Sequence, residues 1–222
     1  MTNVYYVGNY NSHIHRMFSG REGYKLVRDM EDADLVVLQG GSDIDPKMYN
    51  EERHITTWSN EWADMEVKEE YEEARDRGLP VVGICKGAQF ICIMNGGSLY
   101  QDVDNHTTGH DMLDVGTGEV IPVTSTHHQM MREGKDSKGV VIGVANGLAT
   151  RKLYMEEGDE MDAMDGVNIS QSIDPEVIIY PYTLSLAVQF HPEYVDKEHP
   201  SSIYFFKLLD QYLLGEKELC VD

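Results

Sequence analysis

Residues 79–89 read LPVVGICKGAQ, a short apolar run that ends in Gly-x-Cys-x-Gly and continues into a helical pattern. This order predicts a buried strand, a sharp turn at Cys85 and a helix, which is the layout of a nucleophile elbow. Gly83 and Gly87 fit this interpretation, because a Cβ at either position would crowd the turn. At the start of the helix, Cys85 would face backbone N–H groups and the positive end of the helix dipole, which favours a thiolate.

Cys85 has an alternative interpretation as a structural thiol, since cysteine is among the residue types most often buried in proteins. Cys92 illustrates that case. It follows seven residues later on the same helical face, in apolar company, and we assign it to the core. A chemical role for Cys85 therefore depends on partners elsewhere in the chain.

Residues 189–193, QFHPE, supply such partners. If residues 184–191 form a strand, His191 and Glu193 leave its end two positions apart and can point to the same side. A carboxylate can then hold the imidazole in one tautomer while the other ring nitrogen faces a thiol, as in serine and cysteine hydrolases. We therefore predict that Cys85, His191 and Glu193 act together as nucleophile, base and orienting group.

Four stretches of the chain resemble the class I glutamine amidotransferase superfamily, and they occur in its order. They are GGSDIDP at 40–46, GICKGAQ at 83–89, STHHQ at 125–129 and QFHPE at 189–193. The details are most similar to the branch of γ-glutamyl hydrolases that act on γ-glutamyl-GABA, the peptidase C26 branch. The resemblance extends from about Val4 to Tyr194, and it implies Cys85 as the nucleophile, His191 as general base and acid, and Glu193 as the third member of a catalytic triad.

The same resemblance assigns an oxyanion hole to backbone N–H groups at Gly41 and Lys86. Residues 35–40, LVVLQG, are consistent with it, because a buried strand that opens into a Gly-Gly turn brings main-chain donors close to a reacting carbonyl. A simple turn is the alternative. The resemblance also marks Gln89 and His128 as substrate-pocket residues, although Gln89 could instead be a helix residue that hydrogen-bonds a loop.

The histidines offer one rival site. His106 and His110 are four residues apart, and His127 and His128 follow, so a metal centre is conceivable. However, residues 107–109 (Thr-Thr-Gly) argue against the helix that would place both rings on one face. We therefore expect no metal ion and no cofactor.

Composition limits the partners. The 222 residues include 18 basic and 39 acidic side chains, giving a formal charge of −21, which argues against nucleic acid and against anionic membrane surfaces. The three cysteines show no C-x-x-C spacing, so neither a disulfide framework nor a thiolate zinc site is expected. The chain has no long apolar run and no signal-like N-terminus, which predicts a cytoplasmic protein.

Strands and helices alternate along the chain. We expect strands at Val4–Val7, Asp34–Gly40 and Val81–Ile84, and β-rich segments at 119–125, 139–145 and 176–191, placed at the sheet's edge and in hairpins. We expect helices in a stretch that reaches about Arg28, and at Glu61–Arg77, Lys86–Met94 and Ile203–Leu214. The acidic segment Tyr154–Gly166 is expected to be a mobile loop.

The alternation predicts an α/β fold of one domain, residues 1–222. Its core would be an open, mostly parallel central sheet with helices on both faces. The resemblance to class I glutamine amidotransferases implies that this sheet is flavodoxin-like and that a small accessory β sheet accompanies it.

Chemically, these residues predict cleavage of a γ-glutamyl amide through a thioester on Cys85. For this work His191 would need a pKa near the operating pH, which Glu193 would help set. Two enzymatic versions stay open: a glutamine amidotransferase that delivers ammonia to a synthetase partner, and a hydrolase that cleaves a small γ-glutamyl substrate alone. A binding or scaffold subunit with a vestigial site is the alternative from another class, and a homodimer stays open in each case.

Overall fold

The computed structural model describes residues 1–146, 152–154, 160–162 and 174–215. Its centre is a nine-stranded mixed sheet. The parallel half consists, in spatial order, of β2 (Tyr24–Leu26), β1 (Thr2–Val7), β3 (Leu35–Leu38), β4 (Val81–Ile84) and β14 (Ser185–Val188). The antiparallel half continues with β13 (Pro175–Tyr180), β10 (Val140–Ala145), β7 (His110–Asp114) and β8 (Val120–Val123).

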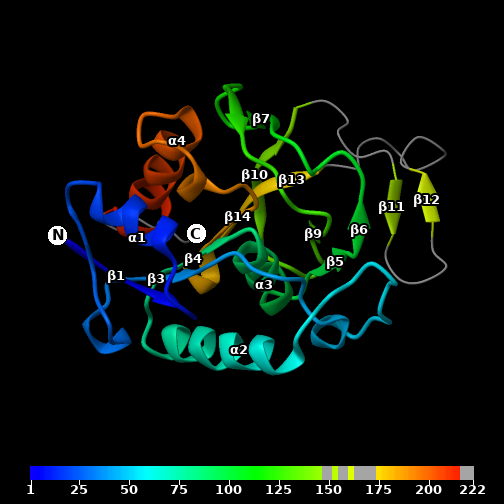
Figure 1. Cartoon of the computed structure of the whole chain (residues 1–222), viewed down its shortest axis with the longest axis horizontal. Coiled ribbons are helices and arrows are strands. Elements are labelled where there is room, and N and C mark those ends of the chain that lie inside the picture. The colour runs from blue at the N-terminus through cyan, green and yellow to red at the C-terminus, as the bar shows by residue number, and fades with distance from the viewer. Residues whose placement is uncertain (147–151, 155–159, 163–173, 216–222) are drawn as a thin grey trace.

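Helices cover both faces of this sheet (Figure 1). On one side lie α1 (Ser12–Ser19) and α4 (Pro200–Leu208), and on the other α2 (Glu61–Asp76) and α3 (Lys86–Met94). Every residue of β3 is buried. Leu35 and Val37 belong to the hydrophobic core on the side of α1 and α4, and Val36 and Leu38 belong to the core on the side of α2 and α3. A strand covered on both faces needs apolar side chains at each position, which explains the run LVVL and confirms the predicted fold class.

The expected helix that reaches Arg28 is wrong. Helix α1 begins after Asn11, whose side chain accepts hydrogen bonds from two backbone N–H groups of the first turn, and it ends at Ser19. Gly23 then adopts a φ of +91°, which L-residues rarely tolerate, and turns the chain into β2. Strand β2 extends the sheet beyond β1.

The segment 176–191 forms the expected hairpin of β13 and β14, joined by a turn at Pro181–Thr183. Its predicted position at the sheet's edge is wrong, because β14 lies inside the sheet and pairs in parallel with β4. In that register Val188 lies opposite Ile84. The ends of both strands therefore meet at one edge of the sheet, and this adjacency decides the geometry of the site.

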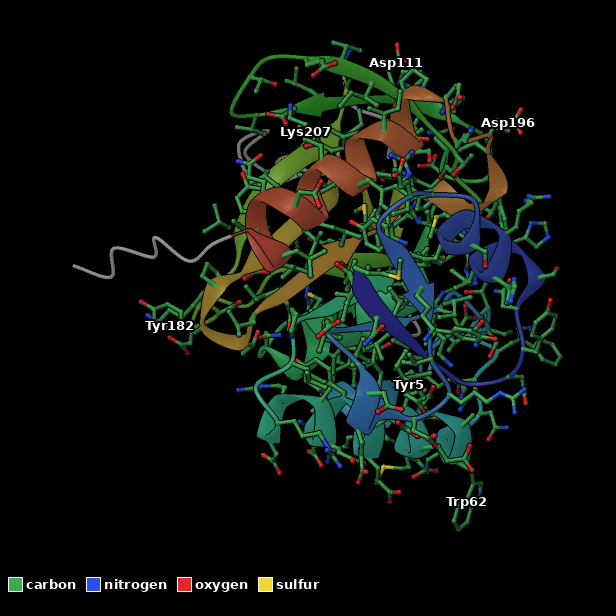
Figure 2. All side chains as sticks on the ribbon, turned by 90° about the vertical axis from the view of Figure 1, so that its left-hand side faces the viewer. Tyr5, Trp62, Asp111, Tyr182, Asp196 and Lys207 are labelled. Atoms are coloured by element: carbon green, nitrogen blue, oxygen red, sulfur yellow. The ribbon has the colours of Figure 1, made fainter. Side chains whose placement is uncertain are left out.

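Helix α2 follows the predicted apolar stripe. Tyr71 and Ala74 are fully buried, and the earlier stripe residues Ala63 and Val67 are half-buried. At the start of the helix Trp62 projects into solvent with 84% of its surface exposed (Figure 2). One carboxylate, that of Asp64, is fully buried on the packed side of this otherwise acidic helix.

Two small β elements complete the structure. The accessory sheet predicted from sequence is present as β12 (Glu160–Asp162), β11 (Lys152–Tyr154) and β6 (Asp102–Val103), and β5 (Ser98–Tyr100) pairs with β9 (Met130–Arg132). The segment expected to be a mobile loop, Tyr154–Gly166, contributes to β11 and β12, and its other residues lie outside the described part of the chain.

Near the C-terminus, α4 has Pro200 in its first turn and continues as a π-helix, Leu209–Leu214. Among the residues described, no helix combines the length and apolar character that crossing a membrane requires.

Candidate active site

Cys85 occupies a strained turn between β4 and α3. Its φ of 51° and ψ of −107° lie outside the regions that L-residues normally populate. A Cβ added to Gly83 would clash with the backbone of Gly87, and one added to Gly87 would clash with the carbonyl of Leu38. Both glycines are therefore required by close backbone contacts around the turn, as the sequence predicts.

His191 and Glu193 leave the end of β14 together. The imidazole Nδ1 and the carboxylate Oε1 are 2.7 Å apart, and both side chains are buried. Thr124, directly after β8, holds the backbone here: its Oγ1 accepts from His191 N at 2.8 Å and donates to His191 O at 3.1 Å. Because Thr124 holds the backbone of His191 and Glu193 holds its ring, the imidazole has one defined orientation.

Cys85 and His191 meet at the edge formed by β4 and β14. The N–H of Cys85 donates to the carbonyl of Val188 at 2.8 Å, which ties the turn to the end of β14. Both side chains lie against Gly40, where an added Cβ would be 2.9 Å from Cε1 of His191 and 3.6 Å from Cβ of Cys85. The structure thus brings together the three residues predicted as a triad.

The charge of His191 differs from the expectation. Burial alone would lower the pKa of His191, but hydrogen bonds and electrostatic attraction to Cys85 and Glu193 outweigh it and raise that pKa to about 10. The direction of this shift departs from the expected pKa near the operating pH, because two acidic partners, and not one, favour the protonated ring. The raised pKa favours the charged form of the ring, the imidazolium.

Tyr194 is a site residue that the sequence interpretation missed. Its ring stacks on His191 with centroids 4.3 Å apart and planes 6° from parallel. An aromatic face suits a cationic imidazole. The available signal was its position directly after Glu193 at the end of the QFHPE stretch.

Asp64 is the second residue that was missed. Its Oδ1 lies 2.7 Å from Nζ of Lys86, and its Oδ2 accepts a hydrogen bond of 2.8 Å from the backbone N–H of Asp45. Gly41 lies beside the same lysine, since a Cβ there would be 3.2 Å from Cδ of Lys86. Asp64 therefore links the start of α3 to the loop that follows β3. Asp64 lies seven residues before Tyr71, so both residues lie on the same face of α2. This spacing was the signal that the sequence offered.

A cavity of about 460 Å³ lies at the carboxyl ends of β1 and β3. Its walls include Gly40, Gly41 and Lys86, so it adjoins the place where Cys85 and His191 meet. Open sheets with parallel strands commonly bind ligands in such a crevice.

The contacts of Gln89 are those of its alternative interpretation, a helix residue that hydrogen-bonds a loop. The side chain is buried, and its Nε2 donates to the carbonyl of Gln129 at 2.7 Å, with a longer contact of 3.4 Å to Oε1 of Gln189. This amide group therefore ties α3 to the loop before β9. Its role toward a substrate stays a prediction.

His128 lies between two carboxylates. Nε2 is 3.0 Å from Asp43, and Nδ1 is 3.0 Å from Asp102. The hydrogen bond to Asp43 outweighs burial, and with Asp102 it raises the pKa of His128 to about 9. The resulting imidazolium fastens the Gly-Gly-Ser-Asp loop to β6.

We expect this bridge to stabilise the fold in a pH-dependent manner. Because the pKa of His128 is raised in the folded state, its contribution is complete below about pH 6.5 and is lost as the pH rises through about 9. The difference in thermal midpoint between the wild type and His128→Gln should therefore shrink across this range. His15→Gln, which changes an exposed histidine, is the control. A difference that stays constant with pH would contradict the bridge.

Comparisons with known proteins identify the family of this chain. The Peptidase C26 family matches residues 18–193. The YvdE homolog of Lactococcus lactis subsp. cremoris, by name a glutamine amidotransferase-like protein, is 30% identical over 100 residues, which cover 43% of this chain and 50% of that relative. Protein NtpR of Enterococcus hirae is 26% identical over 187 residues, covering 74% of this chain and 68% of that protein. The chain spans about half the length of the Lactococcus relative that it matches.

The fold is shared with the glutaminase domain of Trypanosoma brucei CTP synthase. The TM-score is 0.59, and the alignment covers 98% of this chain and 96% of that one at 12% identity. At 12% identity this similarity shows a shared fold and no more. The family match is stronger evidence, because it covers most of the chain. The chain therefore belongs to the Peptidase C26 family, within the class I glutamine amidotransferase superfamily.

Proposed function

We propose that the protein is a cysteine-dependent amidase that cleaves a γ-glutamyl amide bond through a thioester intermediate. The observation that supports this most is the arrangement of His191, which contacts the Cys85 side chain on one side and Glu193 at 2.7 Å on the other, beside a cavity. A thiol, an imidazole and a carboxylate in this order form the set that acyl transfer requires.

The proposed reaction begins from a cationic His191. An imidazolium beside the sulfur favours the nucleophilic thiolate, which attacks the γ-carbonyl carbon of the substrate. His191 then donates its proton to the departing amine, because an amide anion leaves too slowly. The neutral ring next accepts a proton from water, which attacks the thioester and releases the γ-glutamyl group as glutamate.

Stabilisation of the negatively charged oxygen falls to backbone N–H groups of Gly41 and Lys86. Both residues line the cavity, and both are tied to Asp64, Lys86 directly and Gly41 through its own loop. Donors held in place before the reaction cost no reorganisation when charge develops. Gln89 and His128 would border the bound γ-glutamyl group.

Of the two enzymatic versions, we favour the hydrolase that acts alone on a γ-glutamyl amine, because the family match is to Peptidase C26. The version with a synthetase partner is the second candidate, and the similarity to the carbamoyl phosphate synthase small chain of Methanococcus maripaludis, 27% identical over 140 residues, favours it. Glutamate release by the purified chain, with glutamine and a series of γ-glutamyl amines that includes γ-glutamyl-GABA, separates them. Steady turnover of an amine supports the first, and glutaminase activity that rises only with an added partner supports the second. Absence of any turnover would favour the scaffold alternative.

We expect the pH dependence of kcat/KM to depend on Glu193. Protonated His191 is needed to release the amine, so activity should fall as the pH rises through about 10. Glu193→Gln removes a negative charge that holds the proton, so the falling limb should move to lower pH. Glu198→Gln changes an exposed carboxylate nearby and serves as the control. A falling limb that does not move in Glu193→Gln would refute this assignment.

A further inference from the structure

A second cluster of chemically reactive side chains lies beside the candidate active site. One ligand atom each from His106, His110 and Glu176 lies within 4.8 Å of the others. His106 is 0% exposed and Glu176 is 1% exposed, while the His110 side chain is 14% exposed. The sequence argument against a metal relied on the lack of a helix between the two histidines. No helix is needed, because β7 begins at His110 and the sheet places Glu176 of β13 within reach.

The cluster contains buried polar atoms without hydrogen-bond partners among the described residues. Nε2 of His106 lies 3.1 Å from Oδ2 of Asp174, so this nitrogen carries the hydrogen in a neutral ring. Its Nδ1 then keeps a lone pair, has no hydrogen-bond partner, and lies 3.7 Å from Oε1 of Glu176. Oε2 of Glu176 is also unpartnered. A buried lone pair facing a buried carboxylate is unfavourable unless a proton or a metal cation lies between them.

Two distances in the cluster bracket the ligand spacing around a small cation. Nε2 of His110 lies 2.9 Å from Oε1 of Glu176, and Nδ1 of His106 lies 3.7 Å from the same oxygen. Ligands about 2.0–2.2 Å from a tetrahedral Zn²⁺ ion lie about 3.3–3.6 Å from one another. Two imidazoles and a carboxylate are a donor set that Zn²⁺ accepts. Asp174 would orient the ligating ring of His106, as carboxylates behind metal-bound histidines do.

We propose that His106 Nδ1, His110 Nε2 and the carboxylate of Glu176 bind a divalent transition-metal ion, and that Zn²⁺ is the ion they fit best. The ring of His127 lies beside the cluster, 4.7 Å from that of His106; its Nδ1 is 2.9 Å from the carbonyl of Gln129, and its buried Nε2 has no partner among the described residues. This proposal stands independently of the reaction at Cys85.

The other histidine with two carboxylates does not have this geometry. His128 contacts Asp43 through Nε2 and Asp102 through Nδ1, on opposite edges of its ring. No single position for an ion is therefore close both to the two carboxylates and to one lone pair of the imidazole. Both ring nitrogens carry hydrogens instead, in agreement with its raised pKa.

The ion would have a structural role. Ser125 donates to the carbonyl of His106, and the adjacent Thr124 exchanges two hydrogen bonds with the backbone of His191. An ion on His106 and Glu176 would therefore fasten the loop before β7 and the segment after β8 to β13, next to the proposed catalytic base. Binding to the folded state alone raises its stability.

The test uses the full chain carrying Cys85→Ser, because the Cys85 and His191 pair could itself hold Zn²⁺. Metal-free protein is titrated with Zn²⁺ against a chromophoric chelator, and separately with Co²⁺ while visible absorption is recorded. We expect one ion per chain, a higher thermal midpoint with Zn²⁺, and Co²⁺ d–d bands without a thiolate charge-transfer band. His15→Gln, at an exposed histidine, should leave the affinity unchanged.

Variants of the cluster complete the test. Asp174→Asn should weaken Zn²⁺ binding about 10–100-fold, and His110→Gln and Glu176→Gln should weaken it more. Circular dichroism checks folding, and if Glu176→Gln does not fold, His110→Gln, whose side chain reaches the surface, decides. Two results would overturn the proposal: no stoichiometric ion, or binding that His110→Gln leaves unchanged. Either would mean that protons alone satisfy the cluster.

Discussion

Replacing Cys85 by serine is expected to reduce glutamate release from a γ-glutamyl amide by on the order of 10⁴-fold or more. Serine is nearly the same size and can occupy the same turn, but its hydroxyl stays protonated beside an imidazolium, so no nucleophile forms. The loss should appear in kcat with the fold intact. Steady-state assays on the substrate that the screen identifies, together with circular dichroism, measure both.

Cys92 offers a matched control in the same helix. It is fully buried, burial raises its pKa to about 12, and its sulfur lies 3.8 Å from the carbonyl oxygen of Ser98. Cys92→Ala should therefore lower the thermal midpoint and leave kcat nearly unchanged. Turnover retained in Cys85→Ser, or lost to the same extent in Cys92→Ala, would remove Cys85 as the nucleophile.

The second large effect is expected at Asp64, which we regard as a positioning residue. Asp64→Asn keeps the shape of the side chain and an acceptor for the N–H of Asp45, but it loses the charge that holds Lys86. If the two proposed oxyanion donors shift together, kcat should fall about 10–100-fold, less than the 10²–10³ that loss of a whole donor costs. KM should change little, because the stabilisation acts on the transition state.

A double-mutant cycle distinguishes positioning from general destabilisation. Lys86→Met removes the partner of Asp64, so the double variant should lose little more than either single variant. Glu61→Gln, at an exposed carboxylate on the same helix that pairs with Lys47, is the control and should leave kcat unchanged. Losses that add, or a change confined to KM, would contradict the role of Asp64.

Local sequence predicted the central unit of this fold closely. The bounds of β4 and α3 match the expectation, because glycines at fixed positions and a continuous apolar run constrain both the turn and its burial. The meeting of Cys85 with His191 was also expected, since each follows an apolar strand. In such cases the information lies within a few neighbouring residues.

Contacts between distant segments were the part that sequence did not predict. The end of α1 was placed too late, because Gly23 redirects the chain into a strand that only its pairing with β1 stabilises. The interior position of β14 is likewise a property of the assembled sheet.

The partners of buried charged residues could not be predicted from the sequence for the same reason. Asp64 and Lys86 lie far enough apart in sequence that only packing of α2 against the start of α3 joins them. Glu176 gave no signal beside His106 and His110, because the three residues meet only once the antiparallel half of the sheet has formed.

The central claim is that Cys85, activated by His191, is the nucleophile that attacks a γ-glutamyl carbonyl. The most direct measurement is peptide mass spectrometry after treatment with an electrophilic glutamine analogue, in the wild type and in His191→Ala. The account predicts one adduct on Cys85, none on the buried Cys92, and much slower labelling in His191→Ala. An unmodified Cys85, or a labelling rate that does not depend on His191, would contradict it.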